Sequence, residues 1–360
     1  MDYDHERLRR DVQTVCREAV MLFGGLPSMN RYTFLLHLGD NLYGGLEHSC
    51  STLLMASRDS LPEPDNRGST RYAQLLGLFS HEYFHTWNIK AMRPPEYRHY
   101  DLQNEQPTEM LWLFEGFTAF FDNWLLVRSG VITIHSYLEL LAQDIARYRQ
   151  RPGRHVQTLA QSSYEAWTKL YNGGEDAVNS STTYYIQGAL AAFCLDIYLR
   201  AHSEDGVSLP MIMHRLWHDY HRSGEAIDEE RFIRLTADLL PDDLETPLRG
   251  FLRRLVHSTD PLPLDEAAAY IGLTIHMLPA ASNGDLGSDV PTAQRYQSDP
   301  GIRWQKHGNH YHVTRIDDTS PAALAGIAVD DQLIAVNGYR ADDTQLAITK
   351  IGRASCRERV

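Results

Sequence analysis

The most constraining feature of the sequence is HEYFH at residues 81–85, within a segment that has the hydrophobic pattern of a helix. Residues four apart lie one turn above each other on a helix, so His81 and His85 can bind one metal ion. Glu82 lies beside them and can take a proton from a water molecule that the metal activates. Zinc suits this chemistry because it is redox-inert and lowers the pKa of its bound water to about 7. The motif therefore predicts a helix that carries a zinc site.

A zinc site of this kind needs a third protein ligand and an open position. Glu115, within LWLFEG at residues 111–116 of the next predicted helix, is the preferred candidate because its neighbours are apolar. A carboxylate in such surroundings is costly unless it is paired or bound to metal. Glu105 and Glu109 are alternative ligands in more polar surroundings.

A glycine-rich segment, YGGLEH at residues 43–48, follows a predicted strand. Gly44 and Gly45 allow the backbone of a substrate to approach closely, and an extended peptide could add to the strand's edge. Glu47 would then face a free α-ammonium group and pair with it. The alternative interpretation is a turn at the end of a strand with a solvated glutamate.

Two tyrosines, Tyr184 and Tyr185, open a predicted helix that begins YYIQG. A phenol can donate a hydrogen bond to the oxyanion that forms when water attacks a peptide carbonyl. The alternative is that both are partly buried aromatic residues at the start of a helix.

The composition favours a globular protein with two domains. The chain has 360 residues, of which 43% are hydrophobic and 22% are charged. Its apolar runs are shorter than the ~20 residues of a membrane-spanning helix. A formal net charge of -13 argues against a general nucleic-acid-binding protein. The polar start predicts that no signal peptide is present on this chain, and hence a cytoplasmic location.

Hydrophobic periodicity divides the chain into parts. Residues 1–259 predict a mainly helical domain with a small β-sheet. Residues 260–298 are rich in Pro, Gly, Ser and Asp and predict a linker, and residues 299–350 predict a small β-rich module. The last ten residues, 351–360, look like the translation of a sequencing adapter, so we expect an artefact there and a longer natural protein.

The C-terminal module resembles a PDZ domain in SPAALAGI at residues 320–327 and DQLIAVNG at residues 331–338. Asn337-Gly338 suits a tight turn between two strands. The resemblance implies a groove that binds the C-terminal peptide of a partner by strand addition. Because the similarity ends near Lys350, we expect a truncated module of marginal stability that lacks one wall of the groove.

Four segments in this order, GGLEH, HEYFHTWN, LWLFEGFTAFF and YYIQG, resemble the glycyl aminopeptidase family. These are zinc peptidases of the gluzincin type with a thermolysin-like catalytic domain and a C-terminal PDZ domain. The resemblance covers most of residues 1–345 and implies a fragment that lacks the family's N-terminal β domain. The sequence departs from the family pattern at Gln187, where the family usually has a lysine.

The resemblance also implies a role for each matching residue. One zinc ion would be held by His81, His85 and Glu115. Glu82 would be the general base and Tyr185, three residues before Gly188, would stabilise the oxyanion. The substrate would be bound by Gly44, Gly45 and Glu47.

The hypothesis that follows is a zinc aminopeptidase that removes small N-terminal residues, Gly or Ala, from peptides with a free N-terminus. One alternative is a PDZ-guided zinc endopeptidase on the same metal centre. The other is an inactive peptidase-like scaffold that binds partners through its PDZ domain, against which the intact His81, Glu82, His85 and Glu115 argue.

Overall fold

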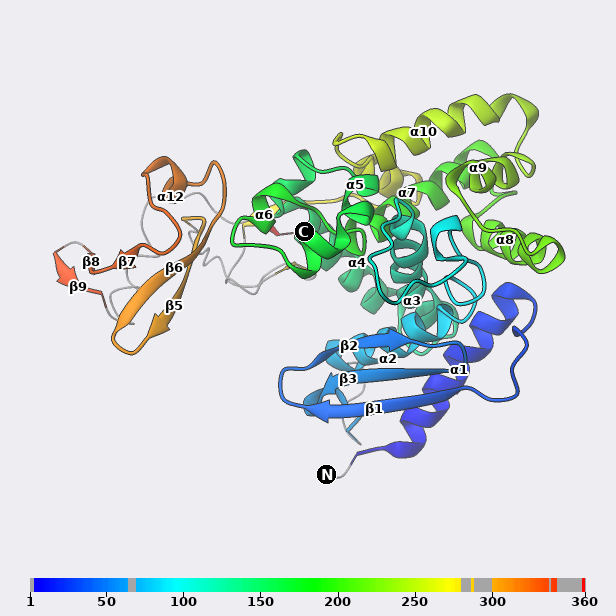
Figure 1. Ribbon diagram of the computed structural model, residues 1–360, viewed down its shortest axis with the longest axis horizontal. Coiled ribbons are helices and arrows are strands. Elements are labelled where there is room, and N and C mark those ends of the chain that lie inside the picture. Colours follow the sequence, from blue (N-terminus) through cyan, green and yellow to red (C-terminus); the bar gives the residue numbers. More distant parts are fainter. Residues whose placement is uncertain are drawn as a thin grey trace.

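The computed structural model describes residues 3–63, 69–279, 286–287, 300–336, 338–341 and 358–359. Helices form most of the main body and cover one face of a small sheet, while a second, β-rich part lies to one side (Figure 1). The first half of the body contains α1 (His5–Phe23), β1 (Thr33–Gly39), β2 (Tyr43–Glu47), β3 (Ser51–Ser57), η1 (Arg58–Ser60), α2 (Thr70–Phe84), η2 (Pro95–Tyr97), the π-helix η3 (Trp112–Gly116) and α3 (Phe117–Arg128). The second half contains α4 (Ile134–Arg149), η4 (Pro152–His155), α5 (Leu159–Tyr164), the π-helix η5 (Ala166–Tyr171), α6 (Ala177–Ser180), α7 (Ile186–His202), α8 (Leu209–Ser223), α9 (Glu229–Ala237), η6 (Asp242–Leu244), α10 (Glu245–His257) and α11 (Leu264–Tyr270).

The three-stranded sheet has the order β1-β3-β2, so β2 is an edge strand. β1 runs parallel to β3 and β2 runs antiparallel to it, with Gly45 opposite Leu54 and Glu47 opposite Thr52. Side chains alternate along β3, so that Leu54 is buried while Leu53 is 43% exposed. The buried face packs on α2, which places the free edge of β2 beside the HEYFH motif.

Aromatic stacking holds the helices that surround this motif. The rings of Phe23 in α1 and Trp87 stack at 4.7 Å, and those of Phe84 in α2 and Phe121 in α3 stack at 4.9 Å. All four side chains are fully buried. These contacts fix α1, α2 and α3 against one another and so provide a rigid support for the site.

The expected helices are present, and the main differences lie near the motif. The hydrophobic pattern predicts a helix from about residue 70 to about residue 89, but α2 ends at Phe84. Ile89 has a φ of 95°, a left-handed conformation that a β-branched residue rarely adopts, and the loop closes through hydrogen bonds from Lys90 N to His85 O and from Met92 N to Trp87 O. Strand β3 was not expected, and it supplies the centre of the sheet.

The main core continues past the expected domain boundary at residue 259. Leu262, Leu264 and Ala267 are buried in the same core, and α11 packs against α7. After β4 (Leu278–Pro279), most of the expected linker lies outside the described residues. Of residues 351–360, the structure describes only β10 (Glu358–Arg359), which pairs with β4.

The second part of the chain forms a small antiparallel sheet. It contains β5 (Ile302–His307), β6 (His310–Ile316), α12 (Pro321–Leu324), β7 (Gln332–Leu333), β8 (Ala335–Val336) and β9 (Tyr339–Arg340). Ile302, Val313 and Ala322 form its core. Asn179 of the main body joins the two parts, because its side chain donates to Ile316 O at 2.8 Å and accepts from Asp318 N at 3.0 Å. The order strand, short helix, strand agrees with the expected module, while Asn337 and residues 342–350 lie outside the described residues.

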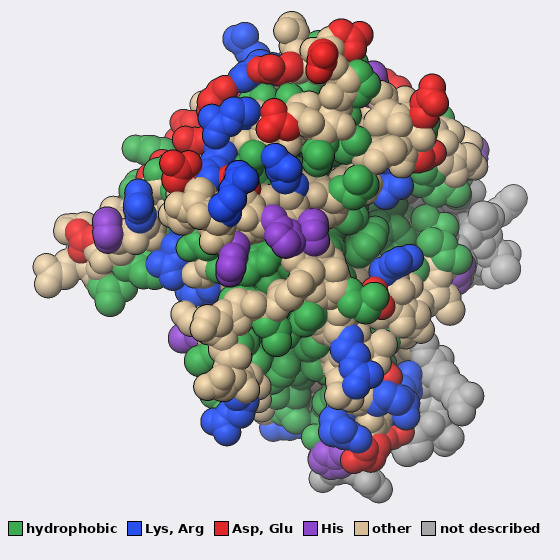
Figure 2. Space-filling view, turned by 90° about the vertical axis from the view of Figure 1, so that its right-hand side faces the viewer, with side chains coloured by type: hydrophobic (Ala, Val, Ile, Leu, Met, Phe, Trp, Pro, Cys, Tyr) green, Lys and Arg blue, Asp and Glu red, His purple; other side chains and the backbone are tan. Residues whose placement is uncertain are grey.

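The face that carries α8 and the end of α1 exposes hydrophobic side chains below a group of histidines (Figure 2). A groove there is lined by residues that include Met21, Met211 and His214, and its lining contains none of the predicted site residues. Among the described residues, no helix has both the length and the hydrophobicity that crossing a membrane requires.

The Arg231 side chain is buried between α8 and α9 and gives a test of the fold. Its Nε lies 3.0 Å from Asp219 Oδ2, and its Nη1 lies 2.6 Å from Glu225 Oε2. We expect Arg231→Met to lower the free energy of unfolding by about 3 kcal/mol, because Asp219 becomes a buried carboxylate without its main partner. Urea unfolding measures this change. The exposed Arg249→Met, which breaks pairs with Glu230 and Glu245, is the control and should have little effect.

The same pair has a defined pH dependence. Burial would raise the pKa of Asp219, but the hydrogen bond and charge of Arg231 lower it below the usual value of 3.8. A lowered pKa in the folded state means that the ionised carboxylate stabilises the fold above the unfolded value and that this stabilisation is lost as the pH falls further. The difference between wild type and Arg231→Met should therefore narrow below about pH 4. An equal difference at pH 3 and pH 7 would contradict this assignment.

Candidate metal centre

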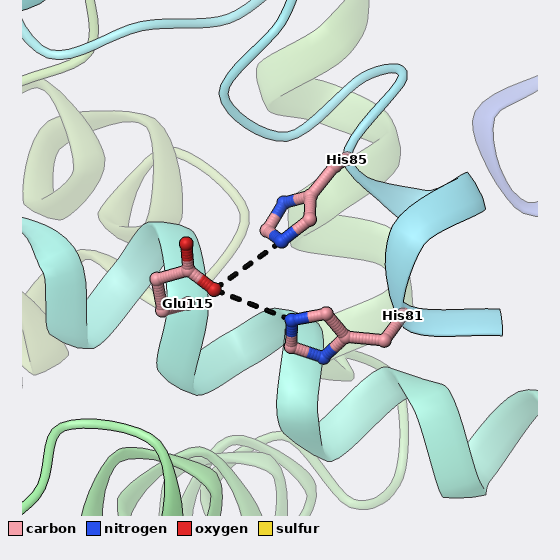
Figure 3. A group of neighbouring side chains, drawn as sticks. All are labelled: His81, His85 and Glu115. Carbon is pink, nitrogen blue, oxygen red and sulfur yellow. Dashed lines mark hydrogen bonds and ion pairs between the residues drawn. The ribbon is translucent and has the colours of Figure 1, made fainter. Parts of the chain in front are cut away.

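The structure brings the three predicted metal ligands together (Figure 3). His81 lies in the last turn of α2, His85 caps that helix, and Glu115 lies on η3. Glu115 Oε2 is 3.3 Å from His81 Nε2 and 3.2 Å from His85 Nε2. Two imidazoles and one carboxylate with a further position open form the donor set of a catalytic zinc site, so these residues fit that metal.

The electrostatics of this group favour an ionised Glu115. Burial would raise the pKa of its carboxyl group, but the charges and hydrogen bonds of His85 and His81 lower that pKa to about 2. An anionic oxygen therefore faces the two ring nitrogens over the accessible pH range, as a metal ligand must.

The second nitrogen of each histidine also has a partner. His81 Nδ1 lies 3.3 Å from Asp122 Oδ2, and His85 Nδ1 lies 2.9 Å from the backbone oxygen of Asn88. Such contacts orient each ring so that Nε2 points at the metal position. Neither Asn88 nor Asp122 was predicted from the sequence, although Asp122 lies seven residues, or about two helical turns, after Glu115.

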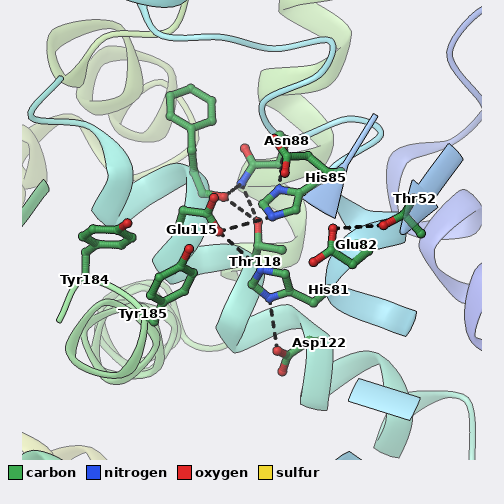
Figure 4. Close-up of polar contacts among 12 residues, drawn as sticks. Thr52, His81, Glu82, His85, Asn88, Glu115, Thr118, Asp122, Tyr184 and Tyr185 are labelled. Atoms are coloured by element: carbon green, nitrogen blue, oxygen red, sulfur yellow. Dashed lines mark hydrogen bonds and ion pairs between the residues drawn. The ribbon is translucent and has the colours of Figure 1, made fainter. Parts of the chain in front are cut away.

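Glu115 stands on a π-helix, and Asn88 supports that irregular turn (Figure 4). The Asn88 amide nitrogen lies 3.2 Å from Leu113 O, 3.1 Å from Phe114 O and 3.1 Å from Thr118 Oγ1. A π-helix changes the backbone hydrogen-bond register, and the Asn88 amide donates to carbonyl oxygens in this turn. The backbone oxygen of Asn88 also accepts from His85 Nδ1, so this fully buried residue supports Glu115 through its side chain and His85 through its backbone.

This arrangement predicts the effect of replacing Asn88. Asn88→Ala removes the amide that supports the turn of Glu115 but keeps the backbone oxygen that accepts from His85. We expect it to weaken zinc affinity by about tenfold or more, because substitution of residues that orient metal ligands typically costs 10- to 100-fold. A zinc titration with a chromophoric chelator measures the affinity. Asn123→Ala on α3 serves as a control, and equal losses in both variants would contradict a specific role for Asn88.

Glu82 is 4% exposed and lies against the edge strand. Its Oε2 is 3.3 Å from Thr52 Oγ1, and that hydroxyl is also 2.9 Å from Leu46 O in β2. Burial raises the pKa of Glu82. A Cβ atom at Gly45 would overlap the Glu82 carboxylate, so the glycine is required for this close approach. Thr52 was not predicted from the sequence, because it reaches Glu82 from β3, which pairs with β2.

The two ends of β2 differ in what they carry. Side chains alternate along a strand, so Tyr43, Gly45 and Glu47 lie on one face of β2. At Gly45 this face points toward Glu82. Glu47 Oε1 is 3.5 Å from Lys90 Nζ, and both side chains are largely buried. The predicted amine-binding carboxylate therefore already has a cation beside it.

Tyr185 lies beside the metal group, with its ring centroid 6.2 Å from that of His81. Its hydroxyl is 3.0 Å from that of Tyr171, which in turn is 3.3 Å from the hydroxyl of Tyr184. Burial raises the pKa of Tyr185, so its phenol stays protonated and able to donate a hydrogen bond. Tyr184 is 1% exposed and belongs to the core, and Tyr171 on η5 was not singled out from the sequence.

Comparisons with known proteins agree with this geometry. Residues 74–191 match the family model of the M61 glycyl aminopeptidase, a range that contains His81, His85 and Glu115. The crystal structure of an aminopeptidase N family protein from Idiomarina loihiensis matches with a TM-score of 0.88 and 30% identity, over 97% of this chain and 58% of that chain. The chain thus spans little more than half the length of that protein.

Two other results complete the comparisons. An M1 zinc metallopeptidase from Deinococcus radiodurans matches with a TM-score of 0.44 and 17% identity over 73% of this chain and 46% of that chain, which is too weak to support an inference. A search of curated proteins found no match. Residues 74–191, which contain the His-His-Glu group, are therefore similar to the M61 glycyl aminopeptidase family, and the fold of nearly the whole chain is similar to that of an aminopeptidase N family protein.

Proposed function

We propose that the chain is a zinc-dependent aminopeptidase that holds one zinc ion and removes small N-terminal residues, Gly or Ala, from peptides. The observation that carries this proposal is the placement of the His81, His85 and Glu115 group beside the free edge of β2, with Glu47 at one end of that strand. A peptide added to β2 would present its backbone to the metal group and its amine to Glu47.

Zinc supplies Lewis acidity and activates water at neutral pH. The protein residues provide the rest of the proposed chemistry. Glu82 takes the proton of the attacking water, and its raised pKa makes it a better base than an exposed glutamate. The protonated Tyr185 donates a hydrogen bond to the oxygen that gains negative charge. Glu47 pairs with the α-ammonium group and so sets the distance from the N-terminus to the bond that is cleaved.

The Glu47–Lys90 pair supports a second candidate function. If Lys90 remains on Glu47, the carboxylate is neutralised and a substrate without a free amine can occupy the same edge. The chain would then be a zinc endopeptidase.

A separate proposal concerns the C-terminal part of the chain, residues 299–350. In its described residues the order strand, short helix, strand supports a partial PDZ module that binds a C-terminal peptide.

Paired substrates distinguish these functions. We would assay Gly, Ala and Leu p-nitroanilides, each with an N-acetylated twin, on zinc-loaded protein with and without a chelator. Chelator-sensitive release from free Gly and Ala substrates, with the acetylated twins untouched, supports the aminopeptidase. Equal cleavage of acetylated peptides supports the endopeptidase. Absence of activity in protein that demonstrably holds zinc would contradict both.

A further inference from the structure

A cavity of about 610 Å³ opens from the catalytic residues into the space between α2, α3, α4 and α7. His81, Glu82 and Tyr185 line its inner end, and Tyr43 and Gly45 of β2 form part of its wall. Glu47 is not among the described residues that line it. The cavity therefore lies toward the Tyr43 end of β2, away from the carboxylate proposed to bind the amine.

The position of the cavity fixes which part of a substrate reaches it, provided that the proposed function is correct. A substrate with its amine at Glu47 runs along β2 toward Tyr43, at about 3.3 Å per residue. Gly45 lies against Glu82, so the bond to be cleaved is near Gly45 and the following residue lies near Tyr43. The side chain of that residue, the first of the leaving peptide, is the one that can enter the cavity.

The wall of the cavity combines an apolar surface with an acidic one. Leu78, Leu140 and Ile186 line it and suit an alkyl chain. The charged groups that line it from all sides are His81, three carboxylates and one guanidinium, namely Glu82, Asp122, Asp144 and Arg147. Because Asp122 lies on His81 and Glu82 is the proposed base, Asp144 on α4 is the carboxylate left to recognise a side chain.

Asp144 already pairs with Arg147, but among the described residues only one of its carboxylate oxygens accepts a hydrogen bond. Its Oδ1 accepts from Arg147 Nη1 at 2.9 Å, whereas no hydrogen bond to Oδ2 is recorded among the described residues. The Arg147 side chain is 38% exposed, so it can turn toward solvent when another cation arrives. Burial raises the pKa of Asp144 to about 6 despite the charge of Arg147. An additional cation beside this carboxylate would therefore stabilise its ionised form, which burial disfavours.

We propose that this cavity is the subsite for the first residue of the leaving peptide and that it selects a basic side chain, Lys or Arg, whose charged end pairs with Asp144. The apolar wall contacts the alkyl stem, which long basic side chains can bury while their charge is bound at the tip. A neutral chain of equal length gains the apolar contact alone. An acidic one meets the repulsion of three carboxylates.

Three dipeptide amides test the proposal: Gly-Lys-NH2, Gly-norleucine-NH2 and Gly-Glu-NH2. Lysine and norleucine share the alkyl stem, and the amide removes any effect of a terminal carboxylate. We expect kcat/KM for the lysine substrate to exceed that for norleucine by about tenfold, with glutamate the poorest, because a hydrogen bond to a charged group is of that magnitude. Asp144→Asn should bring the ratio of lysine to norleucine to about one, and Asp144→Glu should restore part of it.

An exposed carboxylate on α11, Asp265, provides a matched control. Arg149 of α4 forms an exposed pair with Asp265, and Asp265→Asn should leave the substrate ratios unchanged. A wild-type protein that cleaves all three amides at similar rates, or that keeps its lysine preference in Asp144→Asn, would overturn the subsite while leaving the aminopeptidase intact. A protein that cleaves none of them would overturn the proposed function and the subsite together.

Discussion

Replacing Glu82 with glutamine is expected to lower kcat by about a thousandfold while zinc remains bound. The substitution keeps the size of the side chain and its contact with Thr52 but removes the group that accepts a proton. General bases contribute on the order of 10²- to 10⁴-fold, which sets the expected loss. Steady-state hydrolysis of a Gly substrate together with zinc analysis of the purified variant measures both effects.

Two further glutamates provide the controls for this variant. Glu115→Gln should lose zinc as well as activity, because Glu115 Oε2 faces both histidine nitrogens. Glu109→Gln, at an exposed position, should keep both. If Glu82→Gln retained more than a tenth of the activity, another base would have to be sought. Loss of zinc from Glu109→Gln would instead reopen the choice of the third ligand.

Substituting alanine for Gly116 or Gly188 is expected to destabilise the fold and damage the site together. A Cβ at Gly116 would lie 2.7 Å from the Cα of Gly188, and a Cβ at Gly188 would lie 2.8 Å from the Cα of Gly116. The obstacle in each case is backbone, so the two helices must move apart. We expect a loss of about 2 kcal/mol in the free energy of unfolding, within the usual cost of overpacking.

The damage to the site follows because η3 carries Glu115 and α7 begins next to Tyr185. Glu115 precedes Gly116 directly, and Tyr185 lies one turn before Gly188, so separation moves a metal ligand away from the proposed oxyanion donor. Urea unfolding and zinc titration measure the two effects. Gly250→Ala in α10 is a matched control with open space around the new methyl group, and it should stabilise the protein by up to about 1 kcal/mol. A Gly116→Ala variant as stable as the wild type would show that the helices can adjust.

Much of the helical body could be predicted from local patterns. The segments that became α1, α4, α8 and α10 have an apolar stripe at helical spacing, which depends only on residues within a few turns. Strand β3 was missed because its Leu53 and Met55 are exposed hydrophobic residues, which hide the alternation of a half-buried strand. The end of α2 was misplaced because hydrogen bonds from a following loop, not a glycine or proline, end the helix.

The residues of the metal group could be predicted from local sequence patterns. His81, Glu82 and His85 are related by one turn of a helix, so their relative positions follow from helical geometry. Glu115 could be identified because an isolated carboxylate among apolar residues requires a partner. Gly45 could also be singled out from the sequence. The close approach of Glu82, which requires a glycine there, could not be predicted.

The orientation of these residues and the identity of their neighbours depend instead on contacts between elements that are distant in the sequence. Asn88, Asp122, Thr52 and Tyr171 reach the site through a π-helix, a strand pairing and contacts between separate helices. The cavity beside Tyr43 likewise joins four helices and a strand. Such positions depend on how elements pack, and packing is set by complementary surfaces distant in the chain, which no local pattern encodes.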